Sequence, residues 1–399
     1  MSLSNLVFVA AKRTPFGAYG GALASLSATD LAERAARASL EQGGISPEEL
    51  DASVWGNVAQ TSVDAIYLAR HVGLRVGMPQ DRSALTVNRL CGSGFEALVQ
   101  GAYLIRQEGM KAILVGGTES MSQAPYALRG ARWGYRMGNG ELEDTLTASL
   151  VDSYTKMPMA ITAENLAVKY GLSREDCDRF ALESQQRAAA AWNAGLMKDE
   201  IAPVKLASKK GETLFERDEH MRADSSLASL AKLAPVFKKD GVVTAGSASG
   251  ITDGACSLVL TTEAHAKAKG WKVLGRMSAW GFVGCDPTIM GIGPVPATHK
   301  ALARWSESSG ARKSVADFKR VEVNEAFAAQ YLAVEKELGL DRAVTNAEGG
   351  AISIGHPLGA SGARLVTHLL YSLARNGGGA GLASACIGGG QGMSVIVEV

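Results

Sequence analysis

Apolar stretches of strand length alternate with amphipathic patterns through the first part of the chain. The runs Leu6–Ala10, Ala52–Asn57 and Ala112–Val115 are rich in apolar residues and predict buried strands. The patterns between them predict helices over residues 29–42 and 95–107. Strands that alternate with helices at this rhythm need crossover connections, so we expect an α/β fold with a mainly parallel sheet.

Two local signals add detail to this half. Thr29 stands at the start of the first helical pattern, where its hydroxyl can cap the helix. Ser46–Glu49 has the residues of a capping box with proline at the first helical position, which predicts a second helix. Ala84–Asn88 then predicts another strand.

The last part of the chain repeats the same order of elements. A strand at Val321–Asn324 is followed by a helical pattern from Ser361 to Arg375 and by a strand at Leu382–Cys386 that ends in glycines. This order matches the strand, helix and strand predicted between residues 52 and 117. We therefore expect two similar halves related by a pseudo-twofold axis.

The middle of the chain has a different composition. Residues 122–243 are more charged and contain a long helical pattern at Ser173–Ala194. The tract Thr244–Leu260 is rich in glycine and then apolar, as expected for a return to the first sheet. The predicted division is an N-terminal half of residues 1–121 plus 244–270, a loop domain of residues 122–243, and a C-terminal half of residues 271–399.

Composition excludes several classes of protein. The chain has 41 basic and 40 acidic residues, a net charge of +1, which argues against a nucleic-acid binder. Its 46 glycines follow no collagen period. The five cysteines are widely spaced, so we expect neither a disulfide framework nor a zinc site. The longest uncharged stretch, residues 376–397, holds eight glycines, which excludes a membrane span.

Two cysteines lie at predicted strand ends beside glycines. Cys91 stands where a strand turns into a helix, and a helix N-terminus favours a thiolate and offers N–H groups to an oxyanion. Cys386 precedes a loop whose glycines can turn N–H groups towards a ligand. The alternative interpretations are a buried structural cysteine for Cys91 and a tight turn for Cys386.

Two more polar residues end up near such strand ends. His356 lies in a glycine-rich segment, and Asn324 ends a predicted strand. A histidine that only fills space and a plain helix cap are the alternatives, and Glu325 can be an ordinary first-turn carboxylate. All four candidates fall at strand ends of a doubled α/β fold, which points to one pocket at the carboxyl edges of the strands.

These segments carry a family resemblance over essentially the whole chain. The sequence resembles the thiolases, most closely the mitochondrial 3-ketoacyl-CoA thiolases and less closely the biosynthetic acetoacetyl-CoA enzymes. The matching segments, in order, are Lys12–Gly17, Asn88–Phe95, Gly116–Met121, Thr162–Asn165, Asn324–Phe327, Gly355–Gly362 and Cys386–Gly392.

The resemblance implies a role for each candidate. Cys91 would be the nucleophile that accepts the acyl group, and His356 would take its proton. His356 and Asn324, through a bound water, would form one oxyanion hole, and the N–H groups of Cys91 and Gly388 the other. Cys386 would be the acid/base that moves the α-carbon proton.

It also implies a binding site for coenzyme A and the acyl chain. Arg222 would lie at the adenine or phosphate end with Ser225 nearby, and Ser249 would contact the pantetheine arm. The further substrate contacts are Met159, Phe237 and Phe327. On local sequence alone, Arg222 is a surface charge and Ser249 a turn residue.

The expected protein is then an enzyme of the layered α-β-α-β-α thiolase fold. It would cleave 3-ketoacyl-CoA of short to medium chain length reversibly, with CoA as a substrate and no metal or tightly bound cofactor. The alternative is an acetoacetyl-CoA thiolase restricted to short chains. We expect a homodimer or homotetramer in a bacterial cytoplasm, or in a mitochondrial matrix with uncleaved targeting.

Two competing functions were weighed against this one. A decarboxylating 3-ketoacyl synthase shares the architecture but does not use a second cysteine like Cys386 in such a glycine loop. A catalytically inactive carrier of acyl-CoA or lipid would not need Cys91, His356, Asn324 and Cys386 together.

Overall fold

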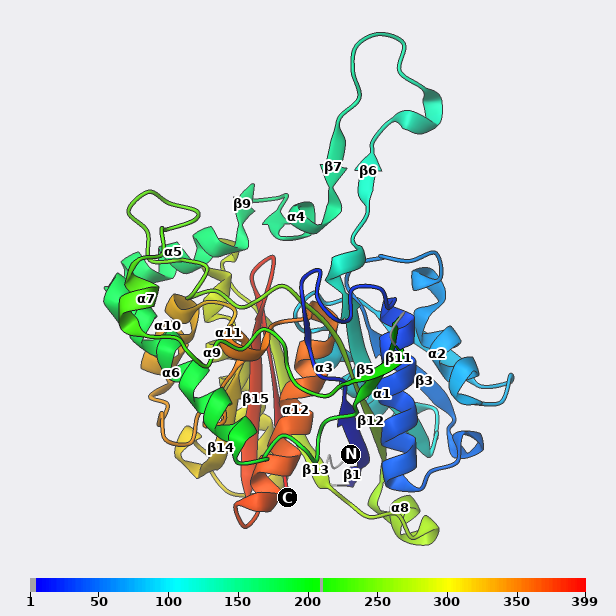
Figure 1. Cartoon of the computed structure of the whole chain (residues 1–399). Coiled ribbons are helices and arrows are strands. Elements are labelled where there is room, and N and C mark those ends of the chain that lie inside the picture. The colour runs from blue at the N-terminus through cyan, green and yellow to red at the C-terminus, as the bar shows by residue number, and fades with distance from the viewer. Residues whose placement is uncertain (1–4, 209–210) are drawn as a thin grey trace.

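The computed structural model describes residues 5–208 and 211–399 and is built around one large mixed sheet (Figure 1). The strands are β1 Leu6–Arg13, β2 Gly17–Ala18, β3 Ala52–Gly56, β4 Ser83–Val87, β5 Ala112–Ser120, β6 Tyr126–Leu128, β7 Leu142–Asp144, β8 Val151–Asp152, β9 Met157–Pro158, β10 Val204–Ser208, β11 Gly211–Phe215, β12 Thr252–Thr262, β13 Gly275–Gly284, β14 Phe318–Val323, β15 Ala380–Ile387 and β16 Gln391–Glu398.

The helices surround and divide this sheet. They are α1 Ala28–Gly43, α2 Leu68–Val76, α3 Ser93–Gln107, α4 Thr145–Ser149, α5 Met159–Tyr170, α6 Arg174–Asn193, α7 Leu227–Ala231, α8 Glu263–Lys269, α9 Pro294–Ser309, α10 Ala328–Leu338, α11 Ala351–Ile354 and α12 Leu358–Arg375. In the described residues, none of them is long and apolar enough to cross a membrane.

The sheet confirms the doubling that the sequence predicts. Its order is β14-β15-β16-β13-β1-β12-β5-β3-β4, with β2 added beside β12. Counted outwards from the β1–β13 contact, the first half runs β1, β12, β5, β3, β4 and the second runs β13, β16, β15, β14. In each half the first strand is innermost and the last strand lies next to it. Within the sheet, the two halves are joined where β1 pairs with β13, at Val7–Arg276 and Phe8–Gly275.

The prediction of a mainly parallel sheet is wrong. Only β14–β15, β3–β4 and β3–β5 are parallel, whereas the strands in the middle of the sheet pair antiparallel. The reason is the last strand of each half, which returns between two earlier strands. In the second half β16 follows β15 through a tight turn at residues 388–390, and such a short connection joins antiparallel strands.

Five layers result from the way helices pack on the two halves. The central apolar cluster joins Leu98 of α3 and Leu369 of α12 to Val115 of the first half and Val395 of the second. Helices α1 and α2 cover the outer face of the first half, and α9 and α10 cover that of the second. This is the α-β-α-β-α layering expected from the sequence.

Three local predictions are corrected by the structure. Ser27, not Thr29, caps α1, because the Ser27 hydroxyl accepts the backbone N–H of Asp30 at 3.1 Å. The capping box at Ser46–Glu49 forms, but it opens a single 3-10 turn, since the chain becomes extended at Leu50 to enter β3.

Strand β5 also runs further than predicted, through Gly116 and Gly117 to Ser120. The glycines do not end it, because they are where another segment packs on its backbone. A Cβ on Gly117 would lie 1.9 Å from the carbonyl oxygen of Gly359, at the start of α12.

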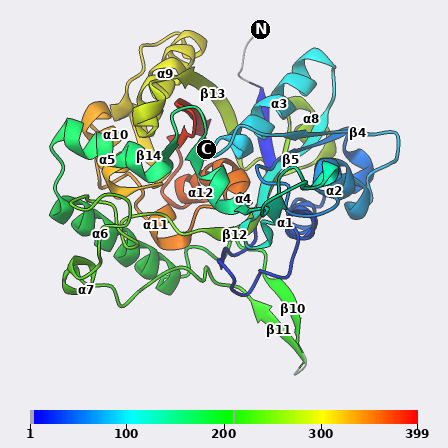
Figure 2. The same cartoon turned by 90° about the horizontal axis from the view of Figure 1, so that it is seen from above.

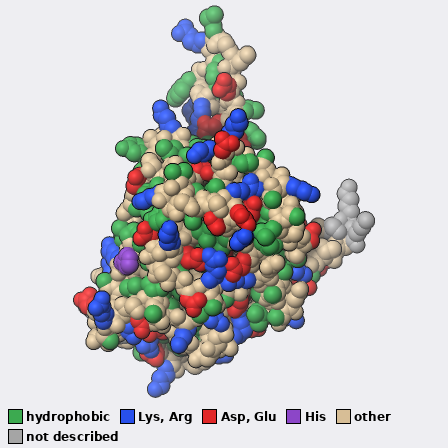
Figure 3. Space-filling view, turned by 90° about the vertical axis from the view of Figure 1, so that its left-hand side faces the viewer, with side chains coloured by type: hydrophobic (Ala, Val, Ile, Leu, Met, Phe, Trp, Pro, Cys, Tyr) green, Lys and Arg blue, Asp and Glu red, His purple; other side chains and the backbone are tan. Residues whose placement is uncertain are grey.

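The segment between the halves supplies helices and two arms. Helices α5 and α6 pack against α10 and α11 of the second half. Strands β6 and β7 form an arm that projects above the body in Figure 1. Seen from above in Figure 2, β10 and β11 project from the side. On the face shown in Figure 3, basic and acidic side chains are mixed among apolar ones, in keeping with the near-zero net charge.

Candidate active site

Three segments at strand ends and one between two helices meet around Cys91. The prediction that His356 also stands at a strand end is wrong, because it lies between α11 and α12. Cys91 lies between β4 and α3, Asn324 follows β14, His356 precedes α12, and Gly388 follows β15. The amide Nδ2 of Asn324 is 3.3 Å from Nε2 of His356. The backbone N–H of Gly388 hydrogen-bonds to the Cys91 sulfur, and Cys91 and His356 line one cavity. The sequence-predicted pocket therefore exists, and it joins both halves of the fold.

The backbone around Cys91 is held in an uncommon conformation. Leu90 has φ +48°, a left-handed value that costs energy for a residue with a side chain. Asn88 Oδ1 accepts the backbone N–H of Leu90 at 2.9 Å. Ser93 Oγ accepts that of Arg89 at 2.8 Å and donates to the Leu90 carbonyl at 2.7 Å. These polar contacts stabilise the turn that presents Cys91.

The glycines beside Cys91 allow close packing of the protein on itself. A Cβ on Gly92 would lie 2.4 Å from Cδ1 of Ile387, and one on Gly94 would lie 2.5 Å from the backbone nitrogen of Ala363. Helix α3 therefore approaches both β15 and α12 more closely than any residue with a side chain permits. This contact brings Cys91 close to the other segments of the candidate site.

Burial decides the protonation state of Cys91. Burial, with a smaller contribution from the nearby Glu119 carboxylate, raises the pKa of the thiol to about 11. The N–H groups of Gly388 and of Cys91 itself act in the opposite direction but do not outweigh burial. Burial therefore outweighs the effect of the helix N-terminus, which favours the thiolate, and a base that takes the proton of Cys91 is needed for it to act as a nucleophile.

His356 has the properties of that base. Burial lowers the pKa of its imidazole to about 4, so the ring is neutral at pH 7. Its Nδ1 is 2.5 Å from Ser361 Oγ, which itself donates to the Pro357 carbonyl at 2.9 Å. Because the serine has one proton and gives it to that carbonyl, Nδ1 must carry the proton of the imidazole. The lone pair of Nε2 is left on the side of Asn324.

Cys386 lies just behind the cavity wall. It is fully buried and packs with Met290 and Ala326, both of which line the cavity. Burial raises the pKa of its thiol well above the ordinary value, and Cys91 and Cys285 nearby act in the same direction. Cys386 is therefore held as a thiol, a form that can donate a proton.

The cavity itself has a volume of 440 Å³ and a mainly apolar wall. Four of the predicted substrate contacts, Met159, Phe237, Ser249 and Phe327, line it with Cys91 and His356. Apolar side chains of Met121, Leu150, Val151, Ile251 and Leu358 complete much of the wall. A chain of methylene groups is the kind of ligand that such a surface accommodates.

Arg222 and Ser225 lie outside that lining. The guanidinium of Arg222 is exposed and donates to the Glu219 carbonyl at 3.3 Å. Ser225 Oγ donates to the carbonyl of Arg222 at 2.8 Å, which closes a turn. Their predicted contact with the distal part of a ligand stays a prediction.

Known protein families match both halves of the chain. Residues 6–264 match the model of the thiolase N-terminal domain, and residues 271–399 match that of the thiolase C-terminal domain. The chain belongs to the thiolase family. The family boundary at residues 264–271 falls between β12 and β13, where the second half of the sheet begins.

Individual relatives extend over the full length of this thiolase. The human mitochondrial 3-ketoacyl-CoA thiolase is 54% identical over 100% of this chain and 99% of its own. Its crystal structure superposes with a TM-score of 0.96 at 53% identity, covering 100% of both chains. The acetyl-CoA acetyltransferase of Chromobacterium violaceum is 46% identical over 98% of this chain and 99% of its own.

Sequence reasoning did not single out Glu119, which this thiolase buries beside the site. One carboxylate oxygen accepts the N–H of Ala59 at 3.0 Å, and the other accepts those of Val58 at 3.1 Å and Gly359 at 2.9 Å. Burial raises the pKa of Glu119 to about 7. The carboxylate joins the loop after β3 to the first turn of α12. Its place in the matching segment Gly116–Met121 was the available signal.

Ser361 was also missed as a functional contact. It was interpreted as the opening of a helix, but α12 begins at Leu358 and Ser361 lies one turn inside it. From there its hydroxyl reaches back to His356. The glycine-rich segment that contains both residues was the signal, and only the start of the helix at Leu358 gives the pair its geometry.

Proposed function

We propose that this thiolase cleaves 3-ketoacyl-CoA with CoA to give acetyl-CoA and a shortened acyl-CoA, and runs the condensation in reverse, through an acyl group on Cys91. One observation carries the proposal: the half-buried thiol of Cys91 and the imidazole of His356 line one apolar cavity, and the buried thiol of Cys386 packs directly behind its wall. The relatives are named for such substrates, and the human enzyme has been crystallised in complex with CoA.

The first step uses His356 as the base. Its neutral Nε2 takes the proton of the Cys91 thiol, and the sulfur attacks the 3-keto carbon. The negative charge that forms on oxygen is stabilised by hydrogen-bond donors already in place, each worth a factor of roughly 10² to 10³. We assign His356 and Asn324 to one oxyanion hole and the N–H groups of Cys91 and Gly388 to the other.

The second step breaks the carbon–carbon bond. The acyl group stays on Cys91, and the departing two-carbon fragment leaves as the enolate of acetyl-CoA. Cys386 gives its proton to the α-carbon of that enolate and becomes a thiolate. The Cys386 thiolate then takes the proton of the incoming CoA thiol. The CoA sulfur attacks the thioester on Cys91, and acyl-CoA leaves. The proton held by His356 returns to the Cys91 sulfur.

The two cysteines make different contributions, and this gives the test. The substrate is acetoacetyl-CoA with CoA, followed by loss of the thioester enolate absorbance. We expect wild-type turnover, an inactive Cys91→Ser, and a Cys386→Ser that still forms an acyl-enzyme from acetyl-CoA but does not turn over. An inactive wild type, or a fully active Cys91→Ser, would contradict the proposal.

The acyl chain is proposed to be short to medium in length. The support is the apolar wall made by Met121, Leu150 and Val151 beside Cys91. Turnover of 3-ketoacyl-CoA with four and with eight carbons compares the two candidates. Undetectable cleavage of the eight-carbon substrate favours the alternative, an acetoacetyl-CoA thiolase restricted to short chains.

CoA is proposed to enter past Phe237, with its pantetheine arm at Ser249 and Met159 and its distal end at Arg222 and Ser225. Phe237 is 47% exposed while lining the cavity, as expected at a mouth. Arg222→Ala should raise KM for CoA and leave kcat nearly unchanged, because a contact at the distal end is the same in the ground and transition states.

Assembly, domain division and compartment complete the proposal. We propose a homodimer or homotetramer, which light scattering distinguishes. Residues 122–243 are proposed as the loop domain between the halves 1–121 plus 244–270 and 271–399, testable by limited proteolysis. The relatives include mitochondrial proteins of mammals and bacterial proteins. A bacterial cytoplasm is the proposal and a mitochondrial matrix its alternative, and the natural N-terminus tests for processing.

A further inference from the structure

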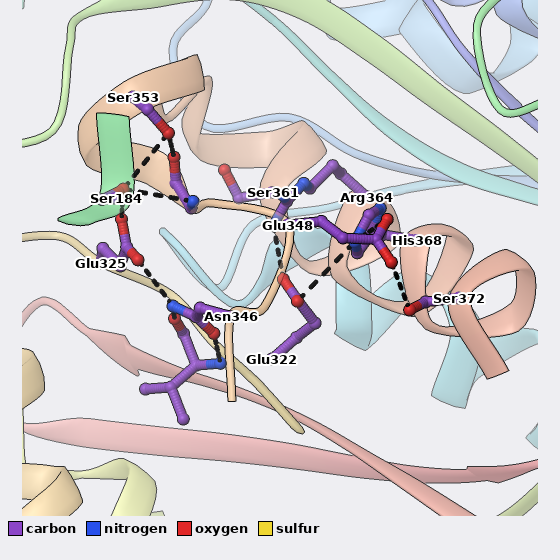
Figure 4. A network of polar contacts seen from close by, with 12 residues as sticks. Ser184, Glu322, Glu325, Asn346, Glu348, Ser353, Ser361, Arg364, His368 and Ser372 are labelled. Atoms are coloured by element: carbon purple, nitrogen blue, oxygen red, sulfur yellow. Dashed lines mark hydrogen bonds and ion pairs between the residues drawn. The ribbon is translucent and has the colours of Figure 1, made fainter. Parts of the chain in front are cut away.

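We propose that Glu325 is a positioning residue of the reaction, whose carboxylate sets the distance between Asn324 and His356. This inference rests on the roles proposed above for those two residues. Glu325 follows Asn324 directly in the chain, and its carboxylate accepts the backbone N–H of Ile352, in the segment that leads into His356. Ser184 and Asn346 also donate to this carboxylate (Figure 4). It thus holds both partners of the 3.3 Å contact between Asn324 Nδ2 and His356 Nε2.

Three donors from three segments surround the carboxylate. Oε1 accepts Nδ2 of Asn346 at 2.8 Å. Oε2 accepts the hydroxyl of Ser184, on α6, at 2.6 Å and the backbone N–H of Ile352, in α11, at 3.1 Å. The side chain is only 1% exposed. Both oxygens are used, so the geometry requires a carboxylate and not an amide, which has one accepting oxygen.

Asn346 links the carboxylate of Glu325 to the last residue of β14, the strand before Asn324. Its Oδ1 accepts the N–H of Val323 at 2.9 Å, and its Nδ2 donates to the Val323 carbonyl at 2.8 Å. The backbone of Asn346 is left-handed, with φ +46°, a conformation that few residues with side chains adopt. The end of β14 and the carboxylate of Glu325 are thereby tied to one side chain.

The second link runs from Glu325 to His356. The carboxylate lies against Gly350, where a Cβ would be only 2.2 Å from Cδ of Glu325. Gly350 is followed by the single turn of α11, then by Gly355 and His356. The backbone N–H of His356 is itself fixed by the Gly250 carbonyl at 3.0 Å. A shift of the turn at Ile352 would therefore move the imidazole relative to Asn324.

A nearby carboxylate shows what a purely structural role looks like. Glu322, three residues earlier, is also buried and in the same network (Figure 4). It pairs with Arg364 at 3.1 Å and lies 3.8 Å from His368. The donors to Glu325 are instead a hydroxyl, an amide and a backbone N–H, all neutral. A buried carboxylate held only by neutral donors is costly to the fold, which suggests that the site benefits from it.

The first experiment compares matched variants in the thiolysis of acetoacetyl-CoA. Glu325→Gln should lower kcat by about 10²-fold, as expected for a displacement near 1 Å, with KM for CoA unchanged. Glu322→Gln, the control, should lower the melting temperature and keep kcat. Ser184→Ala removes one donor to Glu325 together with the acceptor of the Gly350 N–H. It should lower kcat by about tenfold with a smaller fall in melting temperature than Glu325→Gln, so the proposal stays testable if Glu325→Gln does not fold.

A double variant then separates positioning from general stability. If Glu325 acts through Asn324, adding Glu325→Gln to Asn324→Ala should cause little further loss of kcat. Losses that multiply in the double variant overturn the proposal. A native kcat in Glu325→Gln also overturns it. If Glu325→Gln does not fold, a native kcat in Ser184→Ala overturns it instead. An inactive wild type would instead contradict the proposed function, so the two failures are distinguishable.

Discussion

Nδ1 of His356 lies 2.5 Å from Oγ of Ser361, five residues later in the chain and one turn inside α12. The serine hydroxyl donates its proton to the Pro357 carbonyl, so its oxygen accepts a hydrogen bond from Nδ1–H of the imidazole. The imidazole of His356 is therefore oriented by the helix that follows it, and its lone pair is on Nε2, as the proposed role of a base requires.

This relationship predicts the effect of Ser361→Ala. Without the acceptor, the imidazole can carry its proton on either nitrogen, and we expect kcat for thiolysis to fall about 10- to 100-fold. Ser372→Ala is the matched control, because Ser372 lies on the same helix but binds Glu348. Equal kcat values in the two variants would contradict the assignment of Ser361.

The low pKa of His356 predicts an acid limb at unusually low pH. The imidazole remains neutral down to about pH 4, so kcat/KM should not fall near pH 6.5, where an exposed histidine titrates. Rapid pH-jump assays from pH 8 to 4 measure this. If the pH profile of kcat/KM has an inflection near pH 7 and this inflection disappears in Glu119→Gln, it reports the titration of Glu119. A limb at pH 6.5 that Glu119→Gln retains would show that His356 is not buried as described.

The same pKa has a consequence for stability. The unfolded state binds a proton on His356 near pH 6.5, whereas the folded state does so only near pH 4. Stability should thus fall as the pH drops from 6.5 to 4, by roughly 3 kcal/mol, and then level off. Denaturant unfolding of wild type and His356→Asn measures the difference, which should be largest at the acid end.

His368 predicts the opposite dependence on pH. Burial lowers its pKa, but the carboxylates of Glu200, Glu322 and Glu348 outweigh burial and raise it above the ordinary value. Nδ1 lies 2.8 Å from Glu200, and Nε2 lies 3.4 Å from Glu348. A raised pKa means that the stabilisation is complete below pH 6.5 and is lost as the pH rises through the folded-state value.

The test is His368→Gln, with the exposed His299→Gln as control. His368→Gln removes one positive charge from a cluster of three carboxylates, which keep their arginine partners Arg13, Arg364 and Arg375, and should cost about 3 kcal/mol at pH 6. The difference from wild type should shrink as the pH rises, because wild type then loses the same charge. A difference that is constant between pH 6 and 10 would show that His368 is neutral in the folded protein.

Two glycines predict opposite responses to alanine. A Cβ at Gly117 would lie 1.9 Å from the Gly359 carbonyl oxygen, and backbone on both sides leaves little room to move. Gly117→Ala should destabilise by about 3 kcal/mol or more. Gly284 in β13 would place its Cβ 3.8 Å from the Gly390 carbonyl oxygen, an ordinary contact, so Gly284→Ala should change stability by no more than about 0.5 kcal/mol. Similar melting temperatures for both would refute this.

Much of the site could be predicted because its residues stand in short segments with recognisable neighbours. Cys91 and Asn324 follow strands and Cys386 lies near the end of one, whereas His356 lies between two helices in a segment with glycines and a proline. The doubled order of strands and helices was likewise visible in the apolar pattern. Local sequence therefore determined the identity of the elements, the two similar halves and the chemical groups of the site.

Tertiary structure decided how those groups behave. The apolar pattern does not record which strands become neighbours, so it missed the antiparallel middle of the sheet. A helix N-terminus suggested a thiolate at Cys91, but burial raises the pKa of that thiol, and burial is a property of the whole fold. The contacts of Ser361, Glu119 and Glu325 depend on segments that lie far apart in the chain or turn back through a helix. Sequence fixes which donors and charges exist, and only packing fixes their distances and their access to water.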